Sequence, residues 1–199
     1  MSAAIDTQNE PHTLTDLLDA MDHAAQGDTV SVRGVLEEFG DRSITPFILL
    51  VALLMVSPIS GIIGMPTIAA IILVILSAQA LMDRDHIWLP DFILRRKVAS
   101  EKLRKAVSWM RKPCAFFDRH AHRRLPFLTA PPMRQLSVLV CLLYPLSWPP
   151  LEVLPMVTSL AAGAIALLAF GLFTRDGLYT LLGFCTIALQ IGVVVYLLR

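Results

Sequence analysis

Long stretches without a charged side chain limit what this chain can fold into. Residues 43–82, 135–151, 153–174 and 177–198 contain no Asp, Glu, Lys or Arg. An uncharged apolar run of about 18 residues or more is typical of a membrane span. The alternative is a soluble protein with a very apolar core, but only 17% of the residues are charged, which leaves little polar surface to cover a globule. The sequence therefore predicts an all-α, polytopic membrane protein.

Charge is divided unevenly along the chain, although the formal net charge is only +1. Residues 1–43 hold nine acidic and two basic side chains, whereas residues 84–134 hold 13 of the 17 Lys and Arg. Short loops rich in Lys and Arg remain in the cytoplasm, so we expect the central basic segment on that side. The apolar spacing in "LTDLLDAM" predicts an amphipathic helix near the N-terminus, and residues 31–43 predict a second short one.

The basic segment "RRKVASEKLRKAVSWMRKP" predicts a basic amphipathic helix, because Val98, Leu103, Val107 and Met110 recur near helical spacing. Such a helix either lies on an anionic membrane surface or is a solvated helix that only fixes the topology. Nucleic acid is not an expected partner, because aromatic residues are sparse here and membrane segments flank the helix. The side chains expected to face the lipid bilayer and its anionic lipids are Arg95, Arg96, Lys97, Lys102, Arg104 and Lys105.

Two Pro-rich segments resemble each other and predict an internal repeat. "LLMVSPISGIIGMP" begins at residue 53 and "CLLYPLSWPPLEVLP" at residue 141, and each contains Pro-x-Ser, a breaker-rich turn and a further proline. An apolar helix of small residues follows each segment, and the two copies match at a constant offset of 91 positions. The predicted regions are an N-terminal region (1–43), a first membrane hairpin (44–82), a basic linker (83–132), a second hairpin (133–174) and a C-terminal transmembrane helix (175–199).

The first arm of the first hairpin, residues 44–56, is short for a membrane span. It covers roughly 20 Å, against a hydrocarbon core of about 30 Å. The hairpins are therefore predicted to be broken or re-entrant, with Pro and Gly forming turns at membrane depth; the alternative is an ordinary pair of crossing helices. The candidate turn or cavity residues are Pro58, Ser60, Gly61, Gly64, Pro66, Pro145, Ser147, Pro149, Glu152 and Pro155. The candidate polar edge of the hairpins is Gln79, Arg84, Asp85, Arg175 and Asp176.

The expected role of Glu152 depends on how deeply the second turn lies in the membrane. At membrane depth an ionisable side chain is a functional candidate, whereas at the far surface it is merely solvated. The sequence shows no Ser/His/Asp arrangement, phosphate-binding loop or metal-binding helix. His120 and His122 are two positions apart and do not share a helix face. We therefore expect neither an enzyme nor a bound metal or cofactor.

Several of these motifs together point to a known family. "AQAL" (78–81) is followed by "IWLP" (87–90), the basic linker, the second Pro-rich turn and "GLFTRDGLYTLLG" (171–183). Over residues 35–199 the chain resembles the ExoD family of bacterial inner-membrane proteins, which is associated with exopolysaccharide synthesis. The resemblance implies a multi-pass inner-membrane protein that acts in exopolysaccharide production or envelope homeostasis. It supplies no substrate.

Two functional hypotheses follow from the sequence. In the first, the two breaker turns meet near the membrane midplane and form a path for an ion or a small solute. In the second, the protein is a non-transporting scaffold that supports polysaccharide machinery through its basic linker. Because so short a chain can hardly enclose a cavity alone, we expect a homodimer, packed through the small residues Ala162, Gly163 and Ala166.

Overall fold

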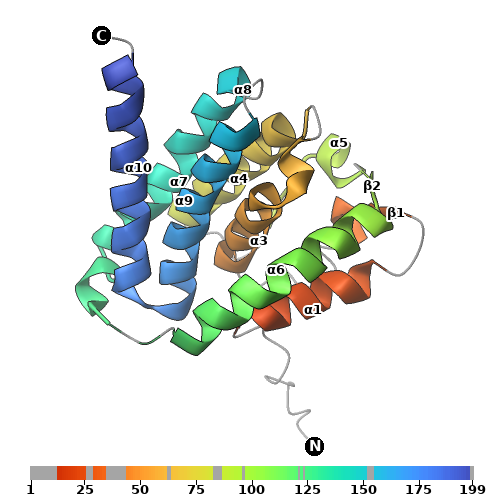
Figure 1. Cartoon of the computed structure of the whole chain (residues 1–199), viewed down its shortest axis with the longest axis horizontal. Helices are drawn as coiled ribbons and strands as arrows, with labels where there is room; N and C mark the ends of the chain where they lie inside the picture. Colours follow the sequence, from red (N-terminus) through yellow and green to blue (C-terminus); the bar gives the residue numbers. More distant parts are fainter. Residues whose placement is uncertain are drawn as a thin grey trace, which may run out of the picture.

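The computed structural model describes residues 13–25, 29–34, 44–61, 64–82, 87–95, 97–120, 122, 124–151 and 155–197. Within these ranges the chain is helical, apart from one short two-stranded ribbon (Figure 1). The predicted all-α class is confirmed at this level.

Five apolar helices form the main bundle: α3 (Ile44–Val56), α4 (Met65–Leu81), α7 (Met133–Leu143), α9 (Pro155–Thr174) and α10 (Gly177–Leu197). Helix α3 packs against α4 and α9, α4 packs against α7, and α9 packs against α10 (Figure 1). Fully buried side chains such as Leu49, Leu73, Ile165 and Leu168 fill the centre. The first helix of each hairpin (α3 or α7) therefore packs on the second helix of the other hairpin (α9 or α4).

Proline and glycine end the apolar helices where the sequence places them. Helix α3 gives way to the 3₁₀ turn η1 (Pro58–Gly61), and α7 continues into η3 (Tyr144–Ser147) and the short helix α8 (Trp148–Leu151). Gly64 has φ +87° and precedes α4, which carries Pro66 in its first turn. A positive φ suits glycine, and proline is tolerated where a helix begins, because the N–H groups there have no helical partner.

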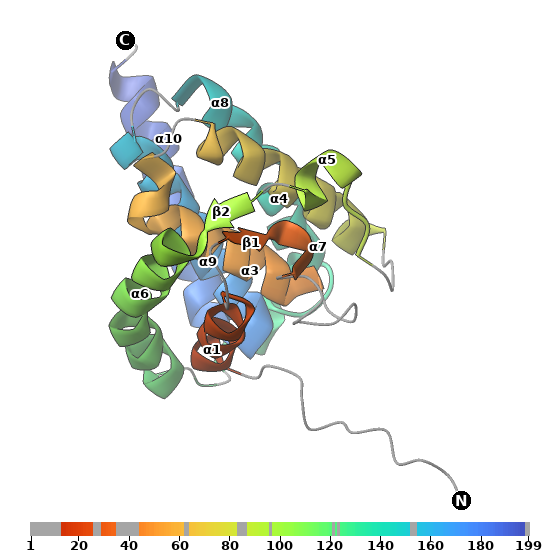
Figure 2. The same ribbon diagram turned by 90° about the vertical axis from the view of Figure 1, so that its right-hand side faces the viewer.

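A second, more polar layer is built from segments that are distant in the sequence. It contains α1 (Leu14–Ala24), β1 (Thr29–Ser31), α5 (Asp91–Leu94), β2 (Lys97–Ala99) and α6 (Ser100–His120). Strands β1 and β2 pair antiparallel, with Val30 opposite Val98. Helices α1 and α6 lie side by side in both views (Figures 1 and 2). The 3₁₀ turn η2 (Pro126–Leu128) leads from this layer to α7.

The structure corrects the predicted linker helix in its position and in the use of its apolar face. Helix α6 begins at Ser100 rather than near residue 95, because residues 97–99 form β2. Its apolar side chains Leu103, Val107 and Met110 are buried in the protein core, facing α1. That face is therefore used by the fold and cannot lie in a lipid surface.

The predicted dimer face is also used inside the chain. Ala162 and Ala166 of α9 are buried, and a Cβ on Gly163 would meet Val56 of α3 at 3.9 Å. Small residues let helices approach closely, and here they serve contacts within one chain, where α9 packs on α3 and α10. The homodimer stays a prediction, but this face cannot form it.

Among the described residues, two helices are by length and composition apolar enough to cross a membrane: Val157–Thr174 and Gly177–Tyr196. Three shorter apolar helices accompany them at Ile44–Val56, Met65–Leu81 and Met133–Ser147. Only 22% of the residues in the apolar span of α10 are buried inside the protein, against 56% of those in the span of α9. The exposed side of α10 carries Leu182, Leu189 and Val195. An apolar face left uncovered in this way is found on surfaces that contact either lipid or another protein.

Candidate functional site

The first breaker turn places hydroxyl groups among apolar helices. The Ser57 hydroxyl donates to the Leu54 carbonyl at 2.6 Å, and proline at position 58 has no N–H to bond that carbonyl in the usual helical way. The Ser60 hydroxyl donates to the Ser57 carbonyl at 3.1 Å. The Ser60 and Ser159 hydroxyl oxygens lie 2.8 Å apart and join η1 to the first turns of α9. Serine side chains therefore satisfy the backbone at the break and also link the two hairpins.

The second breaker turn has different chemistry. Trp148 directly follows the Pro-x-Ser motif of this turn; it is 0% exposed, and its indole N–H has no hydrogen-bond partner among the described residues. Pro145 is buried, whereas Ser147 and Pro149 are exposed. The Ser147 hydroxyl donates to the Tyr144 carbonyl at 2.8 Å. This turn therefore buries one tryptophan and leaves its serine exposed, so it does not gather hydroxyl groups as the first turn does.

Each turn contacts the second helix of the opposite hairpin in addition to helices of its own hairpin. The main contacts of η1 are with α3, α4, α6 and α9, whereas η3 and α8 pack on α4 and α7, and α8 also touches α9. These main contacts join each turn to helices, and residues 62–63 and 152–154 of the two turns lie outside the described residues, so the predicted meeting of the turns stays a prediction. Of the other candidates, Gly61 is exposed, Pro66 is buried, and Pro58 and Pro155 begin η1 and α9. Glu152, Arg84, Asp85 and Arg96 lie outside the described residues.

Two residues of the candidate polar edge, Gln79 and Asp176, form hydrogen bonds that hold the backbone of other segments. Gln79 is buried, and its amide holds the backbone of Trp88: Nε2 donates to the carbonyl at 2.8 Å, and Oε1 accepts from the N–H at 2.6 Å. Asp176 is 0% exposed and accepts from the N–H groups of His122 and Leu178, both at 3.0 Å. Arg175 is exposed and has φ +56°. Asp176 thus fixes the chain after α6 to the corner between α9 and α10.

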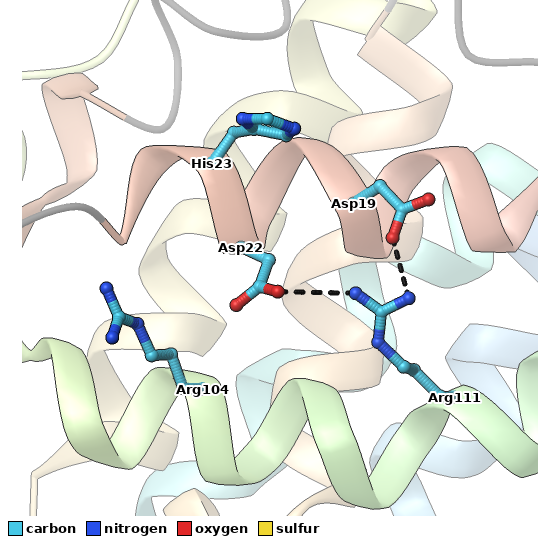
Figure 3. A pocket seen from close by; sticks show the side chains of 5 residues that line it. All are labelled: Asp19, Asp22, His23, Arg104 and Arg111. Atoms are coloured by element: carbon cyan, nitrogen blue, oxygen red, sulfur yellow. Dashed lines mark hydrogen bonds and ion pairs between the residues drawn. The ribbon is translucent and has the colours of Figure 1, made fainter.

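An open, charged hollow lies between α1 and α6, and the sequence reading missed it. Its volume is about 460 Å³, and Asp19, Asp22, His23, Arg104 and Arg111 line it (Figure 3). Arg111 forms ion pairs with Asp19 at 2.7 Å and with Asp22 at 3.3 Å. Arg104, predicted to face lipid, donates instead to the Ala25 carbonyl at 2.6 Å, at the end of α1. The sequence did contain a signal for this contact: Asp19 and Asp22 lie three positions apart on one predicted helix, and the predicted helix of the linker is basic.

Asp118 fixes the other end of α1. Its carboxylate accepts from the N–H groups of Leu14 and Thr15 at 2.8 and 2.9 Å and from the Thr15 hydroxyl at 2.7 Å. These are N–H groups without helical partners, so a residue of α6 caps α1 in addition to Thr13. Burial, with a smaller contribution from Asp118, raises the pKa of the Cys114 thiol from 9.0 to about 12. The charges of this layer are used to hold α1 on α6.

The family match covers nearly all of this architecture, from the start of α1 to the last turn of α10. A family model described as "Exopolysaccharide synthesis, ExoD" matches residues 14–196. The chain belongs to the ExoD family. Among similar proteins is Protein ExoD of Rhizobium meliloti (strain 1021), which is 32% identical over 188 residues; the match covers 88% of this chain and 73% of that protein. No solved structure matches the chain. The ExoD family is associated with exopolysaccharide synthesis.

Proposed function

We propose that this chain is a multi-pass inner-membrane protein that supports exopolysaccharide synthesis by providing a path for a small polar solute or an ion at its first breaker turn. The observation that supports this proposal is the hydroxyl pair of Ser60 and Ser159, which joins the break after α3 to the beginning of α9. In hydrocarbon, backbone groups freed by a break must be satisfied by protein or water. Hydroxyl and carbonyl oxygens gathered there are suitable ligands for a polar solute.

We infer that the two hairpins are related halves. Applying the 91-residue offset to the ends of α4, residues 65 and 81, gives residues 156 and 172, which lie inside α9. The same offset pairs Thr67 with Thr158, and α3 packs on α9 as α4 packs on α7. In both contacts, the first helix of one hairpin packs on the second helix of the other. This symmetry supports a duplicated unit. Broken helices at the interface of repeats are where transporters place their sites.

We propose that the corner between α9 and α10 lies on the cytoplasmic side. Arg175 is exposed there, and the backbone of Arg124 accepts from the Gly177 N–H at 2.7 Å, so the basic linker ends at this corner. Positive charge beside the end of a span favours the cytoplasmic face. Helix α10 would then cross from this face to the opposite one.

The serine pair can be tested with a double variant, Ser60→Ala with Ser159→Ala. We expect at least a tenfold loss of exopolysaccharide in a strain that carries only this variant, with protein abundance unchanged, because the polar link at the break is gone. The matched control is Ser137→Ala, which removes a buried hydroxyl that only donates to its own helix, to the Met133 carbonyl at 3.0 Å. Normal polysaccharide from the double variant, at normal abundance, would contradict the proposed path.

A second candidate function is a non-transporting scaffold for polysaccharide machinery. The observation that favours it is the α1–α6 layer, which is held together by ion pairs and a buried cap and lies within the family match. The double serine variant distinguishes the two functions in the same assay. A path at Ser60 and Ser159 loses activity in this variant, whereas a scaffold keeps it and fails when Arg95, Arg96 and Lys97 are neutralised.

A further inference from the structure

One face of α6 is left uncovered and has an unusual composition. Its side chains recur every three or four positions, which places them on one side of the helix. We name this face the α6 stripe; it consists of Lys102, Lys105, Trp109, Lys112, Phe116 and His120, all exposed. Trp109 is 54% exposed and Phe116 is 60% exposed. The fold therefore leaves two large aromatic rings, with lysines around them, in contact with the surroundings.

The α6 stripe is not needed to hold the helix in the fold. The buried side of α6 carries Leu103, Val107, Met110 and Cys114. A third side, with Arg104, Arg111 and Asp118, bonds to α1. One of these two sides of α6 packs in the core and the other forms hydrogen bonds and ion pairs with α1. The exposed aromatic rings are therefore available to a partner outside the chain.

The position of α6 relative to the apolar helices indicates what that partner is. The segment that follows α6 is tied to the α9–α10 corner by the Asp176 carboxylate and by the bond between Gly177 and Arg124. That corner ends both helices that are long enough to cross a membrane. Where helices that cross a membrane end, the lipid headgroups begin. With α9 and α10 crossing the membrane, as proposed above, the C-terminal end of α6 comes to lie at headgroup level.

The chemistry of the α6 stripe matches this location. Tryptophan and phenylalanine insert at the boundary between headgroups and acyl chains, while lysine stems let the ammonium groups reach anionic phosphates. Glu101, at the edge of the α6 stripe in the first helical turn, is its acidic neighbour on α6. We propose that the α6 stripe binds the surface of an anionic membrane and anchors the α1–α6 layer to it. This inference rests on the proposed membrane location of α9 and α10, and α6 also contacts η1, but it does not depend on the serine pair of the proposed path.

The test uses the full chain in nanodiscs with either purely zwitterionic lipid or about 30% phosphatidylglycerol, both carrying brominated acyl chains. The signal of Trp109 is the difference between the wild-type spectrum and that of Trp109→Phe. We expect bromine quenching of Trp109 to be at least twofold stronger in the anionic discs. A triple variant, Lys102→Gln with Lys105→Gln and Lys112→Gln, should lose this difference, because each lysine strengthens the attraction to the anionic surface.

Two controls keep the outcome decisive. The triple Lys→Arg variant at the same positions keeps the charge and should keep the quenching, and equal melting temperatures show that all variants are folded. Trp109 that is unquenched in both lipids, or equally quenched before and after the Lys→Gln changes, would overturn the proposal. A Trp109 signal that changes with protein-to-disc ratio instead of lipid charge would assign the α6 stripe to a second copy of the chain and also overturn it.

Discussion

At the scale of single residues, polar side chains of this protein act mainly on distant backbone. Gln79 holds Trp88, Asp176 holds the segment after α6, and Asp118 caps α1 from more than 100 positions away. The positions of Gln79 and Asp176 could be marked as polar edges from the sequence, because each interrupts an apolar run. Their partners could not, since the approach of His122 to Asp176 depends on where α6 ends in space.

Cys114 provides a prediction at the same scale. Its pKa is raised to about 12 by burial and by Asp118, so the folded chain keeps the thiol protonated where an unfolded chain begins to ionise it, near pH 9. The stability that this thiol contributes is therefore complete below about pH 9 and is lost as the pH rises towards 12. At pH 9, alkylation should be on the order of 1,000-fold slower in the folded than in the urea-unfolded chain. Peptide-resolved mass spectrometry measures both rates, and equal rates would show that the thiol is not buried.

At the scale of elements, α1 depends on α6 for its place. The apolar spacing of α1 and its Thr13 cap form a helix locally, but a helix of about 11 residues is marginal on its own. Its apolar stripe is buried against α6, and its two ends are bonded to Asp118 and Arg104. The sequence predicted α1 and the basic helix separately, and their pairing is a product of the tertiary structure.

Removing the Asp118 carboxylate tests this dependence. Asp118→Ala takes away three hydrogen bonds at the start of α1, so we expect undocking of α1 to become easier by about 1–2 kcal/mol. Hydrogen exchange of the α1 amides measures this change. The control is Asp91→Ala, because Asp91 forms an exposed ion pair with Arg33 at 3.3 Å, and exposed pairs contribute about 0–1 kcal/mol. Unchanged exchange in Asp118→Ala would show that the local cap of Thr13 alone holds α1.

At the scale of the whole molecule, the proposed path predicts how accessible the first breaker turn is to water. Gly61 is exposed within the chain, and a Cβ at Gly61 or Gly64 has nothing within 4 Å. A cysteine fits without a clash at Gly61, whereas at Gly64 the positive φ adds strain. In a background without the three native cysteines, we expect Gly61→Cys to react partially with small impermeant thiol reagents and not with bulky ones, because the proposed path is narrow and wet. Rapid labelling by both sizes from the periplasmic side would mean that the hairpin crosses and the turn is on the surface.

The apolar helices, their breaks and the family could be predicted from the sequence, whereas the strands β1 and β2 could not. Uncharged apolar runs can only be buried or placed in lipid, and proline and glycine end helices locally. Helix α3 could therefore be delimited at residues 44–56, and the last helix could be placed within residues 175–199. The tertiary structure alone decided which faces remain free. It buried Ala162 against neighbouring helices, turned Arg104 to α1 and left Trp109 exposed. The reason is physical: helical periodicity gives the faces of a helix, but which face is covered depends on contacts between residues far apart in the chain.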